Sequence, residues 1–143
     1  MIKVNSKYKP LFAGETRYYI ILGGRASGKS FAVSSFLCLL SFEEKQRILY
    51  TRQTMTSAYL SIIPEFQEKI DLMGADGKFA INKTEIINKD SGSEILFKGI
   101  QSSSGTNTAN LKSLSGITTW ILDEAEEMVD ETVADSANNS TIP

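Results

Sequence analysis

The sequence predicts an α/β fold built on a mainly parallel sheet, and a few segments carry that prediction. Two runs rich in β-branched and aromatic residues, 17–22 and 46–51, are typical of buried strands. Residues 29–44 lie between them and have the broad apolar face of a helix. A third β-rich run covers 118–122. Strands that alternate with helices favour a parallel sheet.

The loop between the first strand and the helix carries a phosphate-binding motif. Residues 23–30 read Gly-Gly-Arg-Ala-Ser-Gly-Lys-Ser, a full match to G-x-x-x-x-G-K-[S/T]. Gly23 and Gly28 let the backbone turn and approach phosphates closely. Lys29 supplies charge to the β- and γ-phosphates of ATP, and the Ser30 hydroxyl binds Mg²⁺. The expected ATP-binding residues are Gly23, Gly24, Arg25, Ala26, Ser27, Gly28, Lys29 and Ser30.

A second chemical motif follows the last predicted strand, where Asp123 and Glu124 begin an acidic run. Ligands gather at the carboxyl ends of parallel strands, and the Mg²⁺ of a phosphate loop needs an acidic residue there. We expect Asp123 to hold the metal, directly or through water. Glu124 is expected to orient and deprotonate the attacking water. Glu126 and Glu127 are interpreted as surface charges at the start of a helix.

Arg25, inside the loop, has two interpretations. A guanidinium there lies within reach of the γ-phosphate and can stabilise the charge of the transition state as an arginine finger in cis. Alternatively, Arg25 is a solvated arginine paired with a surface carboxylate. The residues alone leave both open.

The 143 residues fit one domain at most, and local patterns divide it into consecutive segments. Pro64 is expected to break the helical segment, so that its second piece runs from Pro64 to Met73 and stops at Gly74. The expected segments are an N-terminal segment (1–16), a strand–loop–helix–strand unit (17–53), a helical segment (54–78), a β-hairpin (79–99), a polar loop (100–117), a strand with a helix start (118–131) and a polar tail (132–143).

Composition narrows the classes of function. The net charge of −2 provides no general field for holding nucleic acid. The absence of histidine excludes histidine-based catalysis and disfavours a zinc site. The single cysteine, Cys38, cannot form an internal disulfide and is expected to be a small buried apolar group. Without a long apolar run or a signal peptide, the chain is expected to be intracellular, with no membrane partner.

Together the motifs resemble those of the tailed-phage terminase large subunits, from about residue 8 to residue 131. The resemblance rests on Gly-Gly-Arg-x-Ser-Gly-Lys-Ser, Arg-Ile-Leu-Tyr-Thr-Arg, Gly-Ser-Glu-Ile-Leu-Phe-Lys-Gly and Trp-Ile-Leu-Asp-Glu-Ala-Glu-Glu. It implies a motor that packages double-stranded DNA into procapsids in the host cytoplasm. Its expected partners are DNA, a terminase small subunit and a portal, and a complete motor would form a ring.

The resemblance also implies a fold and roles for single residues. The fold would be a P-loop NTPase of the additional-strand, RecA-like kind with an inserted β-hairpin. Arg25 matches the family's proposed cis-acting arginine, and Asp123 and Glu124 match its metal-binding and catalytic acidic pair. Residues 8–12 occupy the region that contacts adenine. Arg52 lies where related motors have an arginine of uncertain role, and a plain surface arginine is an equal expectation.

The resemblance stops soon after the acidic motif. The coupling motif, the remaining ATPase strands and the nuclease domain have no counterpart here, so we expect a partial ATPase domain, incomplete at its C-terminus. One missing strand normally lies between the two motif strands, which would then share no hydrogen-bond ladder and leave edges exposed. Two alternatives stay open: a helicase- or RecA-like ATPase, and a non-hydrolysing nucleotide-binding fragment completed by a second chain.

Overall fold

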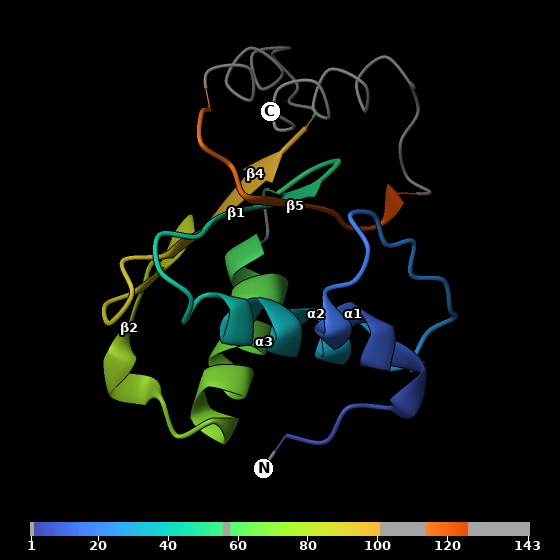
Figure 1. The fold of residues 1–143 in the computed structure, drawn as a ribbon. Coiled ribbons are helices and arrows are strands. Elements are labelled where there is room, and N and C mark those ends of the chain that lie inside the picture. Colours follow the sequence, from blue (N-terminus) through green and yellow to red (C-terminus); the bar gives the residue numbers. More distant parts are fainter. Residues whose placement is uncertain (1, 56–57, 101–113, 126–143) are drawn as a thin grey trace.

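The computed structural model describes residues 2–55, 58–100 and 114–125 of the 143-residue chain. Within these ranges, the helical elements come first, interrupted by a single strand, and the remaining strands follow in succession (Figure 1). The helical elements are η1 (Ser6–Tyr8), α1 (Lys9–Ala13), α2 (Lys29–Leu40), α3 (Ala58–Leu72) and η2 (Asp76–Lys78). The strands are β1 (Arg47–Arg52), β2 (Phe79–Ile81), β3 (Glu85–Asn88), β4 (Glu94–Gly99) and β5 (Thr119–Leu122).

The strands form one five-stranded sheet in the order β2-β3-β4-β1-β5. β1 is parallel to both of its neighbours, β4 and β5, whereas β3 is antiparallel to β4 and to β2. The α/β class is therefore confirmed, but the sheet is mixed rather than mainly parallel. The antiparallel part arises because residues 79–99 return through short turns, which only antiparallel strands allow.

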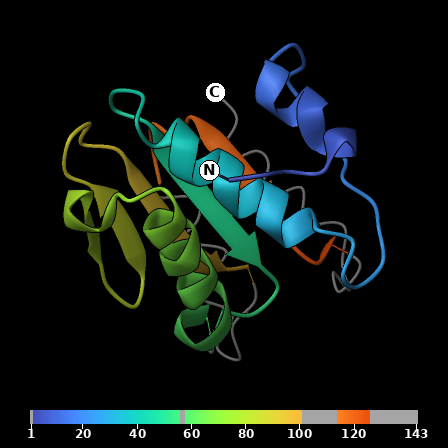
Figure 2. The ribbon, with the colours of Figure 1, turned by 90° about the horizontal axis from the view of Figure 1, so that it is seen from below.

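Helices α2 and α3 lie on one face of this sheet (Figures 1 and 2). The main core forms where they meet β1: Phe66 of α3 packs edge-to-face against Tyr50 and Phe97, at ring-centroid distances of 5.9 and 5.5 Å. A smaller cluster of Leu49, Leu96, Ile100 and Ile117 covers the opposite face. Because side chains alternate along a strand, neighbouring residues of β1 enter different clusters, and the strand is buried on both faces.

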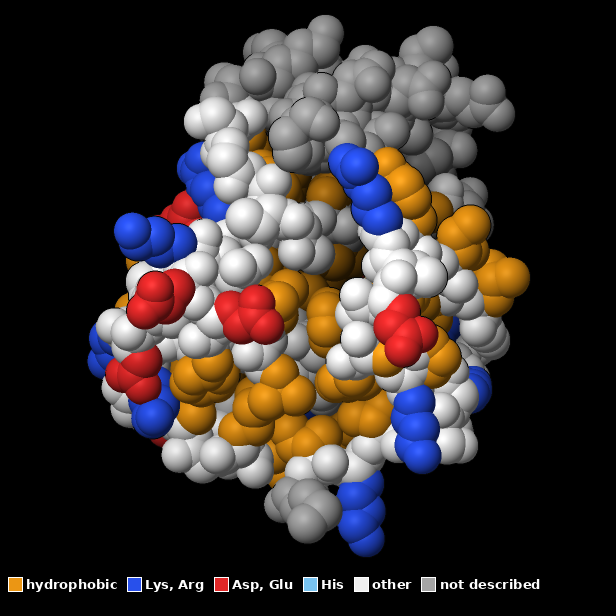
Figure 3. All heavy atoms as spheres, in the orientation of Figure 1, with side chains coloured by type: hydrophobic (Ala, Val, Ile, Leu, Met, Phe, Trp, Pro, Cys, Tyr) orange, Lys and Arg blue, Asp and Glu red, His pale blue; other side chains and the backbone are white. Residues whose placement is uncertain are grey.

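The strand predicted at 17–22 is wrong. These residues are described but form no strand, and Tyr18, Ile20 and Leu22 are 67%, 87% and 82% exposed. A strand needs a neighbour to receive its backbone hydrogen bonds, and among the described strands none pairs with this segment. On the face drawn in Figure 3, hydrophobic side chains lie at the surface in several patches.

The predicted break at Pro64 is also wrong, because α3 continues through it from Ala58 to Leu72. Pro64 itself is exposed, so its ring faces away from the core. It removes one helical hydrogen bond, but Ile62, Phe66 and Ile70 on the inner face are almost fully buried and keep both halves in place. The stop at Gly74 is confirmed: its φ is +65°, and the following N–H donates to the Ile70 carbonyl at 3.1 Å.

Other predicted boundaries need smaller corrections. The strands expected at 46–51 and 118–122 are present as β1 and β5. Helix α2 ends at Leu40 instead of residue 44, and Ser41 caps it with a hydroxyl bond of 2.6 Å to the Cys38 carbonyl. The β-hairpin expected over residues 79–99 contains three strands instead of two, because the chain turns between β2 and β3 as well as between β3 and β4. Most of the polar loop, the helix start after residue 125 and the polar tail lie outside the described residues.

Candidate nucleotide site

The phosphate-loop motif forms a tight turn directly before α2. A Cβ atom at Gly23 would lie 2.8 Å from Ser27 Oγ, so the close return of the loop requires glycine. Gly28 is the N-cap residue of α2, and its φ of +81° lies in the left-handed region. Ala26 also has a positive φ, +58°, which is uncommon for a residue with a side chain. The loop therefore adopts a sharply folded path.

Several hydrogen-bond donors meet at this loop. The Lys29 ammonium group reaches back and donates to the Gly23 carbonyl. Ser27 Oγ is buried and has no hydrogen-bond partner in the part of the chain that the structure describes. The first turn of α2 adds backbone N–H groups at the positive end of the helix dipole. A cation, a buried hydroxyl and free N–H groups around a glycine cradle suit an anion such as the phosphates of ATP.

Tyr8, which is far from the loop in sequence, supports the loop through a hydrogen bond. Tyr8 is 6% exposed, and its hydroxyl donates to the Ser27 carbonyl at 2.9 Å. Its ring would lie 3.8 Å from a Cβ atom at Gly28. Sequence reasoning placed Tyr8 only in a region expected to contact adenine and missed this contact. A single tyrosine in a polar segment carries no local signal of it.

Arg25 and Ser30 are both exposed beside this cradle, Arg25 in the turn of the loop and Ser30 in the first turn of α2. The Ser30 carbonyl accepts a hydrogen bond of 2.6 Å from the Ser34 hydroxyl. Both side chains are therefore available at the surface of the loop.

The acidic pair lies at the end of the sheet. The Asp123 N–H donates to the Thr51 carbonyl at 2.8 Å, which continues the pairing of β5 with β1. Asp123 Oδ2 accepts three hydrogen bonds, from the Tyr50 hydroxyl (2.8 Å), Arg52 Nε (3.0 Å) and Arg52 Nη2 (2.8 Å). Asp123 Oδ1 accepts the N–H of Glu124 at 3.0 Å. Two side chains of β1 thus fix the carboxylate that follows β5.

Arg52 also contacts the second acidic residue, with Nε 3.4 Å from Glu124 Oε2. Glu124 has a φ of +52°, so the chain turns sharply as it leaves the strand. Burial alone would lower the pKa of Arg52, but the hydrogen bonds and charge of Asp123 raise it overall. Of the two expectations for Arg52, the plain surface arginine is therefore wrong. The pairing joins residues far apart in sequence, and nothing in the sequence signals it.

Helix α3 brings two further charged residues toward this end. Burial raises the pKa of Glu65; the positive charge of Lys69 opposes that shift, and the negative charge of Asp123 adds to it. Lys69 is only 2% exposed, with Nζ 3.2 Å from Glu68 Oε2 and 4.5 Å from the centroid of the Phe31 ring. Sequence reasoning missed Lys69. A usable signal was its place on the apolar stripe of the helix, three residues after a buried phenylalanine.

The phosphate loop and the carboxyl end of β5 lie on the same side of the molecule in two perpendicular views (Figures 1 and 2). The sequence-predicted residues thus form two groups near one end of the sheet: the loop with Lys29 and Ser30, and the acidic pair Asp123 and Glu124. The acidic group is tied to β1, and the loop is tied to the N-terminal segment.

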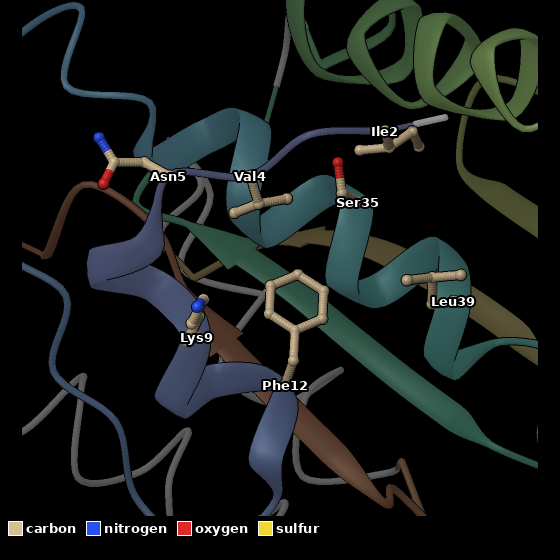
Figure 4. Close-up of a pocket in the computed structure, with 7 residues that line it drawn as sticks. All are labelled: Ile2, Val4, Asn5, Lys9, Phe12, Ser35 and Leu39. Carbon is tan, nitrogen blue, oxygen red and sulfur yellow. The ribbon is translucent and has the colours of Figure 1, made fainter.

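A separate pocket of about 310 Å³ lies between the N-terminal segment and α2 (Figure 4). It is bordered by Phe12, whose ring packs edge-to-face on Phe36 at 5.5 Å, and by Ser35, whose buried hydroxyl has no partner among the described residues. Its lining residues are Ile2, Val4, Asn5, Lys9, Phe12, Ser35 and Leu39. It contains none of the residues predicted to bind phosphate or metal.

Comparison with known proteins supplies the family. A family model described as phage terminase large subunit matches residues 15–139. The chain belongs to this family. The match includes the phosphate loop and both acidic residues, so the resemblance inferred from the motifs is confirmed. None of the curated proteins matches the chain. Membership in the terminase large subunit family supports a role in phage DNA packaging.

No helix in the described part of the terminase chain is long and apolar enough to cross a membrane.

Proposed function

We propose that this chain is the ATP-binding and ATP-hydrolysing portion of a terminase large subunit, which powers the packaging of double-stranded DNA into procapsids. Its fold would be a P-loop NTPase of the additional-strand, RecA-like kind, with an inserted β-hairpin in residues 79–99. The family match supports the packaging role. The observation that carries the ATP assignment is the loop itself, in which a Cβ atom at Gly23 would lie only 2.8 Å from Ser27 Oγ and Lys29 folds across the turn.

The loop residues Gly23 to Ser30 would surround the phosphates of ATP. Lys29 would exchange its bond to the Gly23 carbonyl for the β- and γ-phosphate oxygens, which are better acceptors because they carry negative charge. The unpartnered Ser27 hydroxyl supplies one more donor. Arg25, exposed on the same turn, would stabilise the charge that develops on the γ-phosphate.

Bound Mg²⁺ supplies positive charge that neutralises the phosphate oxygens. The donors for it are oxygen atoms, which is the ligand type that Mg²⁺ prefers: the Ser30 hydroxyl and the Asp123 carboxylate. Glu124 follows Asp123 and would accept a proton from the attacking water. Nε of the neighbouring Arg52 lies 3.4 Å from Glu124 Oε2.

Calorimetric titration of the chain with Mg²⁺ and ATP tests the proposal. Binding should occur, and Lys29→Ala should weaken it by about 100-fold, because the substitution removes the charge on the phosphates. Lys89→Ala is the matched control, since Lys89 is an exposed lysine in the turn after β3, away from the loop. An equal loss in both variants, or no binding to a folded chain, would contradict the ATP assignment.

Hydrolysis is tested separately. Glu124→Gln should keep ATP binding and lower turnover by about 10²- to 10⁴-fold, since the amide cannot accept a proton. ATP binding by the unsubstituted chain without any turnover would instead favour the non-hydrolysing fragment completed by a second chain. Family membership does not favour the helicase-like alternative.

The partners follow from the family and belong to the proposal. They are double-stranded DNA, a terminase small subunit and a portal, met in the host cytoplasm, with a ring of subunits as the working form. Stimulation of the ATPase by duplex DNA, and not by single strands, would separate packaging from helicase activity.

A further inference from the structure

The two oxygens of Asp123 differ in the number of hydrogen bonds that they accept. Oδ2 accepts three, at 2.8, 3.0 and 2.8 Å, from the Tyr50 hydroxyl and from two nitrogens of Arg52. Oδ1 accepts one, the N–H of Glu124 at 3.0 Å. A carboxylate oxygen has two lone pairs. Oδ2 is therefore saturated by β1, and only Oδ1 keeps a free lone pair.

These bonds are held by a firm arrangement. The side chains of Arg52 and Asp123 are 24% and 26% exposed, so water competes only partly for the pair. Tyr50 is 6% exposed and packs against Phe66 and Phe97, which fixes the position of its hydroxyl. The backbone bond from Asp123 to Thr51 sets the base of the carboxylate. The carboxylate therefore has little freedom to rotate.

This asymmetry matters for the choice of metal. Ca²⁺ accepts six to eight oxygen ligands in flexible arrangements and commonly takes both oxygens of one carboxylate. Mg²⁺ requires a near-octahedral arrangement and is usually bound by single oxygens of one or two carboxylates. A carboxylate with one oxygen already saturated can offer only the single-oxygen mode.

We propose that Arg52 makes the site selective for Mg²⁺ over Ca²⁺ by occupying Asp123 Oδ2 with two nitrogens, so that a metal meets only Oδ1. The inference rests on the proposed function, because it requires Asp123 to hold the metal of ATP. Arg52 is then a positioning residue: it acts through Asp123 and does not itself touch the metal.

The ratio of two affinities isolates this effect from charge. Removal of the Arg52 guanidinium makes the site more negative, which favours both divalent cations alike. Dividing the Kd for ATP with Ca²⁺ by the Kd for ATP with Mg²⁺ cancels that contribution and leaves the effect of ligand geometry. A purely structural role of Arg52 would lower the melting temperature and leave the ratio unchanged.

The experiment is calorimetric titration of the 143-residue chain with ATP in the presence of either metal. Arg52→Ala should lower the ratio about tenfold, which corresponds to a loss of about 1.4 kcal/mol in the preference for Mg²⁺ over Ca²⁺. Arg52→Lys keeps the charge but not the two-nitrogen contact and should lower the ratio about threefold. Tyr50→Phe removes one of the three bonds but leaves both Arg52 nitrogens on Oδ2, so its ratio should stay near that of the unsubstituted chain. Arg52→Lys provides the test if Arg52→Ala does not fold.

Arg47→Ala is the matched control. Arg47 is at the other end of the same strand and forms a comparable ion pair, with Nε 2.6 Å from Glu94 Oε1 and side chains that are 34% and 29% exposed. Its ratio should equal that of the unsubstituted chain. Circular dichroism melting of each variant confirms that folded protein is compared.

A ratio unchanged within about twofold in folded Arg52→Ala would overturn the inference, because tenfold corresponds to only about 1.4 kcal/mol and is easily measured. Equal tightening of both metals would also overturn it and would show that the guanidinium merely competes for the carboxylate. Asp123→Asn separates the two proposals. If it leaves the affinity of both metal complexes unchanged, the metal assignment itself fails. If it weakens them while Arg52→Ala leaves the ratio intact, only the selectivity role of Arg52 fails.

Discussion

Strand β1 and the segment 17–22 begin from similar sequences and reach opposite ends of the range of burial. β1 reads Arg-Ile-Leu-Tyr-Thr-Arg, and the segment reads Arg-Tyr-Tyr-Ile-Ile-Leu. Ile48 and Leu49 of β1 are fully buried, whereas Ile20 and Leu22 are 87% and 82% exposed. The difference shows that a β-rich composition makes a strand only where neighbouring strands accept its backbone hydrogen bonds.

The largest expected effect comes from the residue that holds β1 against α3. Phe66→Ala should lower the free energy of unfolding by about 3–5 kcal/mol, because it leaves a cavity beside Tyr50 and Phe97. Leu22→Ala, in the exposed segment, should cost less than about 0.5 kcal/mol. Urea unfolding measures both. A loss above about 2 kcal/mol for Leu22→Ala would show that the segment is packed as firmly as the core, which breaks the comparison.

A smaller effect is expected where β1 holds the edge strand β5. The Thr51 hydroxyl accepts the Trp120 indole N–H at 2.8 Å and donates to the Ile121 carbonyl at 2.7 Å. Thr51→Val keeps the shape, removes both bonds and should cost about 1–3 kcal/mol. Trp120 is the single tryptophan, so its emission reports the change directly. Exposed Thr54→Val serves as the control, and equal losses in the two variants would contradict the assignment.

The next prediction concerns the buried thiol of Cys38, which belongs to the same core as β1. Burial raises its pKa from 9.0 to about 12, and the charge of Lys69 opposes the shift. The folded state therefore keeps the proton more tightly than the unfolded state. The resulting stabilisation is complete below pH 9 and declines as the pH rises toward 12.

The free energy of unfolding measured between about pH 8 and 10.5, a range that brackets the pKa of an ordinary thiol, checks this prediction. Cys38→Ala should lose stability less steeply above pH 9, by a slope equivalent to up to one proton. Some slope should remain, because burial also raises the pKa of Tyr50. Identical slopes in the two proteins would contradict a buried, protonated thiol.

The reactivity of thiols offers a second comparison of the two regions. The thiol of Leu22→Cys should react with thiol reagents at once, while Cys38 should be protected.

The smallest effect on stability is expected in the segment itself. Ile20→Lys and Leu22→Lys should change the free energy of unfolding by less than about 0.5 kcal/mol, because both side chains already face water. The same changes should reduce self-association at high concentration, since they remove exposed apolar surface. Analytical ultracentrifugation measures this second effect. A large loss of stability would show that these side chains have partners.

Local patterns predicted what depends on local chemistry. Strands β1 and β5 and the stop at Gly74 follow from short-range rules of spacing and backbone conformation, and the structure has these elements where expected. The prediction of a strand at 17–22 failed because a strand needs a neighbouring strand to pair with, and the local sequence does not show whether one is present. The break at Pro64 failed because the packing of the inner face of α3 outweighs one missing hydrogen bond.

The candidate site divides in the same way. Asp123 and Glu124 could be found from an acidic run after an apolar strand, but the saturation of one Asp123 oxygen by Arg52 could not. That contact joins residues 71 positions apart and depends on β1 and β5 being parallel neighbours in register. Lys69 was missed because a lysine on the apolar stripe of α3 has no evident partner in the sequence. Its partner, the Phe31 ring, comes from helix α2.

The contact between Tyr8 and the Ser27 carbonyl has a practical consequence for any shortened version of this protein. The family match begins at residue 15, so a boundary drawn from sequence similarity would discard Tyr8. The glycine-rich turn would then lose the hydrogen bond from the Tyr8 hydroxyl. Under the proposed function, the ATP affinity of such a piece would be lower than that of the 143-residue chain. Peptide tags fused close to the first residues carry the same risk and belong at the other terminus.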